Sequence, residues 1–318
     1  MFVHILNVFD PGIDMGNNDK DNGNTITHKY IFFNGKRKAL ISTQAYKRWI
    51  RDRMTEISGE DYSTLVEESI EMKDYFNKFK ESKKEVTEIQ IVTNDIIQKF
   101  RGMDLFGYVI TSTPKKTIPP HRQAVIAMSP LVSIIEGYNK FTRTRANSKD
   151  ENSLTSEIPF LAVYKNIISI DVNRIGKFTK SETYALRVPS NEIIIDLTRD
   201  NNYVKNELSL FLNAMFTLNA KTKRSSYLAN FIPIVSIFIV TNIGTNPFSS
   251  IQFNVKDDTV IIDNNFINVI SNYYKLFDKN AKIFVVKPLP FETEHVTIDV
   301  DNVIDNIFDA IDKVIDNI

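Results

Sequence analysis

The sequence predicts an α+β fold of the split β-α-β type found in ferredoxin-like and RNA-recognition domains. The first observation is the order of elements, because apolar stretches typical of strands alternate with two amphipathic helical stretches as β-α-β, β-α-β. The second is the length of the connections, which exceed what this core needs. We therefore expect a single domain, residues 1–318, in which large insertions are joined to a small core.

The strands are predicted from runs of apolar and β-branched residues bounded by turn residues. The opening run, FVHILNV at 2–8, is the first of them. Further core strands are expected at 106–111, 161–172 and 231–241, and weaker strand patterns occur at 124–135 and 192–197.

Two amphipathic helices complete the predicted core. In 42–54, Ser42 or Thr43 can cap the helix, and apolar residues recur three and four positions apart. The side chains that should be buried are Tyr46, Trp49, Ile50 and Met54. The second helix, over 203–218, shows the same period.

The remaining segments are expected to be connections or appended helices. Residues 10–27 are rich in Asn, Asp and Gly and predict a polar loop, and Asn34-Gly35 predicts a tight hairpin. Residues 60–100 have helical spacing. The polar stretch 140–159 lacks periodicity, which is typical of a protruding insertion, and 300–318 predicts a C-terminal amphipathic helix.

Composition bounds the class of protein. The hydrophobic fraction of 42% and the charged fraction of 25% are ordinary for a globular chain. Cysteine is absent, which excludes disulfides and thiolate sites and fits a reducing cytoplasm. The N-terminus lacks the features of a signal peptide, and the strongest apolar run, 231–240, is too short to span a bilayer. We expect a cytoplasmic protein without a membrane partner.

The formal net charge is zero, from 39 basic and 39 acidic residues, but the charges are unevenly distributed. Eight basic residues accompany one acidic residue in 28–53, and six accompany one in 111–147. Eight acidic residues accompany one basic residue in 291–318. Basic clusters next to loops and helix edges can line a groove for a phosphate backbone, although solvated surface is the ordinary role of such runs.

No pattern indicates catalysis. The four histidines are scattered without metal-ligand spacing, and His4 lies in an apolar strand, where a structural role is expected. Asp19 and Asp21 could bind a divalent ion, but turn formation in an Asn/Gly loop is the more common role. We expect no catalytic residue, metal or cofactor.

Four segments in order along the chain resemble a known family. NDKDNGNTITHKYIFFNGKRKALISTQAYKRWIR is similar to the N-terminal signature of the backbone subunit of type I CRISPR surveillance complexes, the CasC/DevR family of the RAMP superfamily. Its Ile-Ser-Ser-Gln-x-x-Lys-Arg motif stands here with Thr43 in place of the second serine. The other three segments are MDLFGYVI, FLAVYKNIISIDVNRIGKF and AKTKRSSYLANFIPIVSIFIV.

The resemblance implies a RAMP palm, a modified ferredoxin-like fold with inserted finger, web and thumb elements, and 140–159 is the thumb candidate. It implies a non-catalytic subunit of Cascade that polymerises along the CRISPR RNA and presents kinked guide segments to target DNA. The implied partners are CRISPR RNA, target DNA, copies of itself and other Cascade subunits. The expected RNA-binding residues are Lys36, Arg37, Lys38, Ser42, Thr43, Gln44, Lys47, Arg48, Arg51, Lys140, Arg143, Arg145, Lys221, Lys223 and Arg224.

Two alternatives stay open. Related backbone subunits of type III complexes cleave target RNA with an aspartate in the loop after the first strand, where Asp19 and Asp21 lie. The chain could also be a homo-oligomeric structural protein without nucleic acid. As a further hypothesis, the acidic C-terminal residues keep the outer surface from binding nucleic acid indiscriminately.

Overall fold

The computed structural model describes most of the chain in several stretches. The described residues are 1–13, 18–20, 25–33, 35–62, 101–109, 121–135, 138–139, 142–145, 154–157, 160–178, 197–218, 231–289, 293 and 295–318. The predicted helices of 60–100, residues 192–196 of a weak strand pattern and the basic cluster 221–224 therefore lie largely or wholly outside the described part.

The main sheet is antiparallel and is centred on β1 (Phe2–Ile13), which pairs with β13 (Phe160–Asp171) and β16 (Val235–Thr241). Its described order is β19-β16-β1-β13-β9-β5-β4, and β8 and β10 also pair with β13. The remaining bounds are β4 Tyr30–Phe33, β5 Lys36–Ile41, β8 Ile126–Met128, β9 Leu131–Ser133, β10 Tyr138–Asn139 and β19 Lys282–Val286.

This order interlocks two β-α-β units. The first unit is β1, α1 (Thr43–Ser58) and the β8–β9 segment, and β13 lies between its strands. The second is β13, α5 (Asn201–Phe216) and β16, and β1 lies between its strands. The split β-α-β arrangement expected from the sequence is therefore present in a mixed, mainly antiparallel fold.

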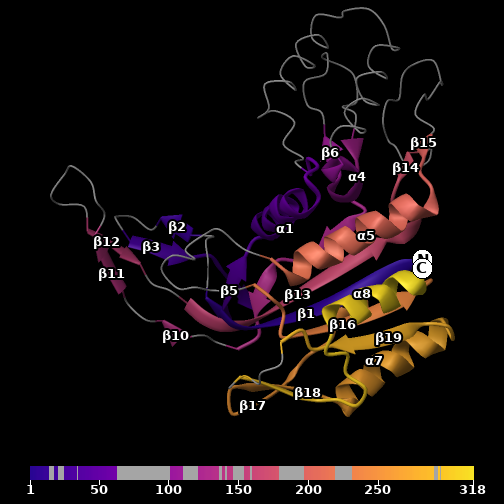
Figure 1. Cartoon of the computed structure of the whole chain (residues 1–318). Helices are drawn as coiled ribbons and strands as arrows, with labels where there is room; N and C mark the ends of the chain where they lie inside the picture. Colours follow the sequence, from indigo (N-terminus) through magenta and orange to yellow (C-terminus); the bar gives the residue numbers. More distant parts are fainter. Residues whose placement is uncertain are drawn as a thin grey trace, which may run out of the picture.

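α1 and α5 lie together on one face of the sheet (Figure 1). Tyr46, Trp49, Ile50 and Met54 of α1 are all buried, as their spacing predicts. They join a core with Val3, Ile5 and Phe9 of β1 and with the apolar side of α5. His4 points to the other face, where its Nε2–H donates to the carbonyl oxygen of Ile243 and its Nδ1 is hydrogen-bonded with the hydroxyl of Ser169, so its predicted structural role is confirmed.

The opposite face of the sheet is covered by a C-terminal layer that the sequence did not reveal. It contains α7 (Asn264–Phe277) and a small sheet in which β18 (Thr259–Asp263) pairs with β17 (Asn254–Lys256) and β20 (Val296–Asp299). Its apolar side chains pack against Leu6 and Val8 of β1.

The predicted helix at 300–318 is too long. α8 covers Ile307–Asp316 and starts at Asn306, whose side chain accepts a hydrogen bond from the backbone N–H of Phe308. Ile304 instead forms a bridge to Val286 of β19, because extended backbone lets it reach the sheet edge. The apolar residues at 300–304 have helical spacing but do not share one helix face. Val300 and Val303 pack against one core cluster, and Ile304 packs against the other.

Two segments predicted to be loops form a separate sheet, which we call the arm. Its order is β11-β12-β3-β2, with β2 Asn18–Lys20, β3 Thr25–His28, β11 Thr142–Arg145 and β12 Leu154–Glu157. β3 pairs in parallel with β12, from the 140–159 insertion. The arm extends away from the body at the left of Figure 1. The β2–β3 and β11–β12 pairs are local, but the two pairs are joined only through β3 and β12, which are more than a hundred residues apart. The polar composition of these strands gives no sign of that long-range pairing.

The strand predicted at 106–111 is wrong in its first half. Gly102–Phe106 form the short helix α4, and Tyr108–Val109 form a strand, β6, which pairs with β7 (His121–Arg122) outside the main sheet, while residues 110–111 lie outside the described part. Gly107 separates the two with φ of 73°, and a Cβ there would lie 2.5 Å from the carbonyl oxygen of Arg122. In the main sheet, the place beside β13 that was expected for residues 106–111 is occupied by β8 and β9.

The remaining described elements are short. β14 (Lys177–Phe178) pairs with β15 (Leu197–Thr198), and 3-10 turns occur at Val172–Arg174 and Pro247–Ser249. No helix in the described part of the chain is long and apolar enough to cross a lipid bilayer.

Candidate nucleic-acid interface

The start of α1 is built by a side-chain cap. Ser42 has extended backbone, with φ of −64° and ψ of 147°, and its Oγ accepts a hydrogen bond from the backbone N–H of Ala45 over 3.3 Å. Thr43 and Gln44 follow in the first turn, and Gln44 is exposed. The start of a helix attracts anions, because its first N–H groups point outward and the helix dipole is positive there. The Ser42 hydroxyl, however, is already engaged in the cap.

A stripe of polar and basic side chains runs along α1 opposite its buried face. Gln44, Lys47, Arg48 and Arg51 are three or four residues apart, so they share one side of the helix. We call these four residues the α1 stripe. Arg48 is exposed, whereas Lys47 and Arg51 are half-buried.

The cations of the stripe are crowded. Burial, followed by the charge of Arg51, lowers the pKa of Lys47. Burial also lowers the pKa of Arg51; Asp52 opposes this and Arg48 adds to it. The guanidinium of Arg51 lies 5.7 Å from the centroid of the Phe106 ring, which helps to hold it in place. A bound polyanion would relieve the repulsion between these cations.

The basic segment 36–38 is divided between the two faces of the β4–β5 hairpin. Phe33 pairs with Lys36, so the hairpin turns between these two residues as predicted, and Gly35 has a φ of 73°. Strand alternation places Arg37 with Ala39 and Ile41 on the α1 side, and Lys36 and Lys38 on the other. Lys38 donates to the carbonyl oxygen of Ile134 over 2.5 Å, so it holds strands together as well as carrying charge.

Lys165 is a basic residue near Lys38 that the sequence analysis missed. It is half-buried in the middle of β13, and burial followed by the charge of Lys38 lowers its pKa. Its ammonium lies 5.7 Å from the centroid of the Phe253 ring. The available signal was the one basic residue in a strand, FLAVYKNIISID, that is otherwise mainly apolar.

The other predicted site residues are separate from the α1 stripe or outside the described part. Arg143 and Arg145 lie in β11 of the arm. Lys140, Lys221, Lys223 and Arg224 lie outside the described residues. Arg122, which contributes to the positive count in 111–147, is buried at 3% exposure and forms an ion pair, so it is not part of a basic surface.

The sites considered for catalysis are only partly described. Asp19 lies in β2, opposite Thr27 of β3, and Asp21 is outside the described residues. Within the described ranges, no three His, Asp or Glu side chains are grouped so that they could hold a metal ion.

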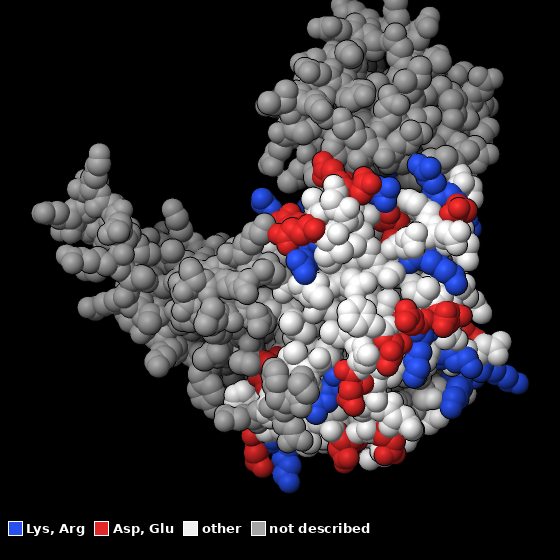
Figure 2. All heavy atoms as spheres, in the orientation of Figure 1, with Lys and Arg blue, Asp and Glu red and all other residues white. Residues whose placement is uncertain are grey.

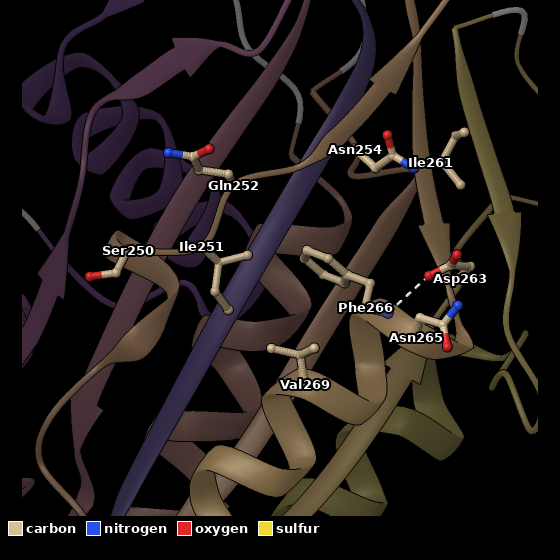
Figure 3. Close-up of a pocket in the computed structure, with 9 residues that line it drawn as sticks. All are labelled: Ser250, Ile251, Gln252, Asn254, Ile261, Asp263, Asn265, Phe266 and Val269. Atoms are coloured by element: carbon tan, nitrogen blue, oxygen red, sulfur yellow. Dashed lines mark hydrogen bonds between the residues drawn. The ribbon is translucent and has the colours of Figure 1, made fainter.

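A depression of about 500 Å³ lies between β17, β18 and α7, away from α1. Figure 3 shows Ile251, Phe266 and Val269 facing one another across it. Its lining contains no lysine or arginine among the described residues, and Asp263 accepts a hydrogen bond from the Phe266 backbone N–H as the cap of α7. The depression therefore lacks the charge that a phosphate site needs.

Solved structures share this fold over nearly the whole chain. A chain of a "CRISPR RNA-guided surveillance complex, pre-nicking" has a TM-score of 0.59 and 12% identity, and the match covers 99% of each chain. A chain of a "CRISPR RNA-guided surveillance complex" has a TM-score of 0.55 and 11% identity, covering 99% of this chain and 100% of the other. The class defined by the fold is thus the mixed α+β fold found in chains of RNA-guided surveillance complexes.

The family is defined by sequence. Residues 15–261 match the model of the family described as "CRISPR-associated negative auto-regulator DevR/Csa2". The chain belongs to this family, so the membership predicted from four short segments is confirmed. No curated protein sequence matches the chain.

Proposed function

We propose that the protein is a non-catalytic backbone subunit of a type I CRISPR surveillance complex, Cascade. Its main sheet with α1 and α5 is the RAMP palm, and the 140–159 insertion, which supplies β11 and β12 to the arm, is the thumb. Copies of the chain polymerise along one CRISPR RNA, bind its phosphate backbone and present kinked guide segments for pairing with target DNA. Other Cascade subunits complete the complex, which acts in the cytoplasm.

The observation that carries this proposal is the crowded α1 stripe beside a capped helix start. Burial is the main cause that lowers the pKa of Lys47 and of Arg51, and a neighbouring cation adds to each shift. A phosphate backbone supplies compensating charge at such a stripe without reading sequence. The stripe lies inside the segment that matches the family. Arg37 extends the same side of the molecule toward the hairpin.

The test is guide binding by the assembled complex carrying Lys47→Ala with Arg48→Ala, over a range of salt concentrations. We expect weaker binding for every guide sequence and a salt dependence reduced by about 1.4 in log–log slope, because two phosphate contacts are lost at about 0.7 each. Lys275→Ala with Lys279→Ala, two exposed lysines at the end of α7, is the matched control. Loss for only some guide sequences, or no loss, would contradict backbone recognition at the stripe.

The non-catalytic part of the proposal has its own test. The purified complex is incubated with matched target RNA and a divalent metal ion, and no cleavage is expected. Cleavage that disappears in Asp19→Ala or Asp21→Ala would instead assign the chain to type III-like ribonucleases.

The polymerisation is tested with guides of increasing length. Particle mass should rise in steps of one chain as the guide is extended. A constant mass would show that the chain does not assemble along the RNA.

A further inference from the structure

The β4–β5 hairpin exposes an aromatic pair with an arginine stacked on it. Phe32 is 72% exposed and Tyr30 is 44% exposed, and their ring centroids are 5.5 Å apart in an edge-to-face arrangement. The guanidinium carbon of Arg37 lies 3.8 Å from the centroid of the Tyr30 ring. Single exposed apolar side chains are common on protein surfaces, but adjacent exposed rings form an apolar patch, and such patches often mark binding sites.

The position of the pair follows from the register of the hairpin. Tyr30 lies opposite Ala39, and Phe32 lies opposite Arg37. Ala39 is buried in the core beneath α1, so the face that carries it continues beyond the start of α1 and ends at the two aromatic rings. The rings and Arg37 therefore lie on the same side of the sheet as α1.

The hairpin and the α1 stripe are connected by one strand. β5 runs from Lys36 to Ile41 and leads directly into the Ser42 cap. At about 3.3 Å per residue, Arg37 lies roughly 16 Å along the chain from Ser42. A single strand of nucleic acid bound at the stripe can thus reach the hairpin within a few nucleotides.

The chemistry of the cluster suits an unstacked base. Every base has a flat π-face that stacks on an aromatic ring, and an arginine next to the ring attracts the adjoining phosphate. The exposed Lys36 adds positive charge at the hairpin turn. Lys36 lies on the other face of this hairpin, and the cation beside the rings is Arg37, whose charge favours an anionic ligand over an apolar protein surface.

We propose that Tyr30, Phe32 and Arg37 form a stacking site for one unstacked base of single-stranded RNA, next to the phosphate track of the α1 stripe. This inference rests on the proposed function, because it assumes that RNA follows the stripe. It adds a contact to the bases that is independent of their sequence.

The experiment uses the full chain and a single-stranded RNA that carries the fluorescent base 2-aminopurine at successive positions. Phe32→Leu keeps an apolar side chain but removes the ring. We expect its affinity for RNA to fall by about 5- to 140-fold, which is about 1–3 kcal/mol of stacking per base at 1.4 kcal/mol per tenfold. The quenching of one 2-aminopurine position should disappear, and the salt dependence should stay as in the unmodified protein.

Ile31→Ala is the matched control, because Ile31 lies on the other face of the same hairpin, opposite Lys38. Its affinity and quenching should match those of the unmodified protein. If Phe32→Leu changes neither affinity nor quenching while Lys47→Ala with Arg48→Ala weakens binding, the stacking site is wrong and the proposed function stands. If neither variant weakens binding, both proposals fail.

A second copy of the chain is the competing occupant of this surface. If Phe32→Leu leaves RNA affinity unchanged but reduces self-association measured by sedimentation without RNA, the aromatic pair is a contact between protein copies. That result would overturn the stacking site.

Discussion

Arg122 and Asp104 form a buried ion pair, with Nη2 of Arg122 lying 2.6 Å from Oδ1 of Asp104. Arg122 also donates to the carbonyl oxygens of Asp104, Lys177 and Arg174. Oδ2 of Asp104 accepts from the backbone N–H of Gly176 and from the hydroxyl of Tyr203 in α5. The pair therefore joins α4, the turn after β13 and α5 at a single buried point.

Removing one member of this pair should destabilise the fold strongly. Arg122→Leu leaves the Asp104 carboxylate buried without its counter-ion, and the expected loss is about 3–5 kcal/mol in the free energy of unfolding. Burial already raises the pKa of Asp104, with Arg122 opposing that rise. Denaturant unfolding measures the loss.

Adding Asp104→Asn to Arg122→Leu should recover part of this stability. The substitution removes the buried charge, and its amide oxygen can still accept from Gly176. A double variant less stable than Arg122→Leu alone would show that the charge is not the cause.

Glu207 should make stability depend on pH. Both carboxylate oxygens accept from the hydroxyl of Tyr62, and Arg101 lies 3.4 Å from one of them. Burial raises the pKa of Glu207 to about 7 from an ordinary value of 4.5. The folded protein thus holds the proton of Glu207 more tightly than the unfolded chain does. The protonated side chain therefore adds to the free energy of unfolding below pH 4.5, and this addition is lost as pH rises through about 7.

The test compares Glu207→Gln, which mimics the protonated acid, with the unmodified protein. From pH 5 to pH 8 the variant should gain stability relative to the unmodified protein, by up to roughly 3 kcal/mol. Glu60→Gln alters the exposed acid that pairs with the same arginine, Arg101. The difference in free energy of unfolding between this variant and the unmodified protein should change little from pH 5 to pH 8. A difference for Glu207→Gln that is constant with pH would contradict the prediction.

Substitutions of Ser42 should separate folding from RNA binding. Ser42→Ala removes the cap of α1 and should lower the free energy of unfolding by about 1 kcal/mol. Ser42→Asp keeps the cap and should retain stability, but its negative charge should weaken RNA binding at the helix start. Thermal unfolding and guide affinity are measured on both variants. Wild-type affinity in Ser42→Asp would show that no phosphate lies at this end of α1.

The acidic C-terminal residues give a prediction about non-specific binding. Figure 2 shows acidic side chains gathered around α8, with basic side chains beside them. Asp305, Asp309 and Asp312 are exposed, whereas Asp301 also holds Asn264 through two hydrogen bonds. Changing the first three to Asn should raise binding to random DNA at low salt without the loss of structure that Asp301 substitution risks. If the variant binds random DNA no more strongly than the unmodified protein, the acidic residues do not protect the surface from non-specific binding.

Local signals account for the parts of the fold that the sequence predicted. The period of Tyr46, Trp49, Ile50 and Met54 and the Asn34-Gly35 turn depend on neighbours in sequence, and the structure has both. The arm joins two local strand pairs, β2–β3 and β11–β12, across more than a hundred residues, and the polar composition of both pairs suggested loops. Among site residues, the α1 stripe could be predicted from helical spacing. Lys165 and the exposed Phe32 could not, because strand register decides which face they occupy.

The central position of β1 constrains how the chain acquires its structure during synthesis. Its first residues pair with Asp171 on one side and Thr241 on the other. At 5–20 residues per second, a ribosome needs roughly 12–48 s to add the 239 residues that follow Phe2 up to the end of β16 at Thr241. Throughout that interval, the apolar β1 has at least one unpaired edge. β1 is therefore made before both of its partner strands, and it is paired along both edges only after β16 has been made.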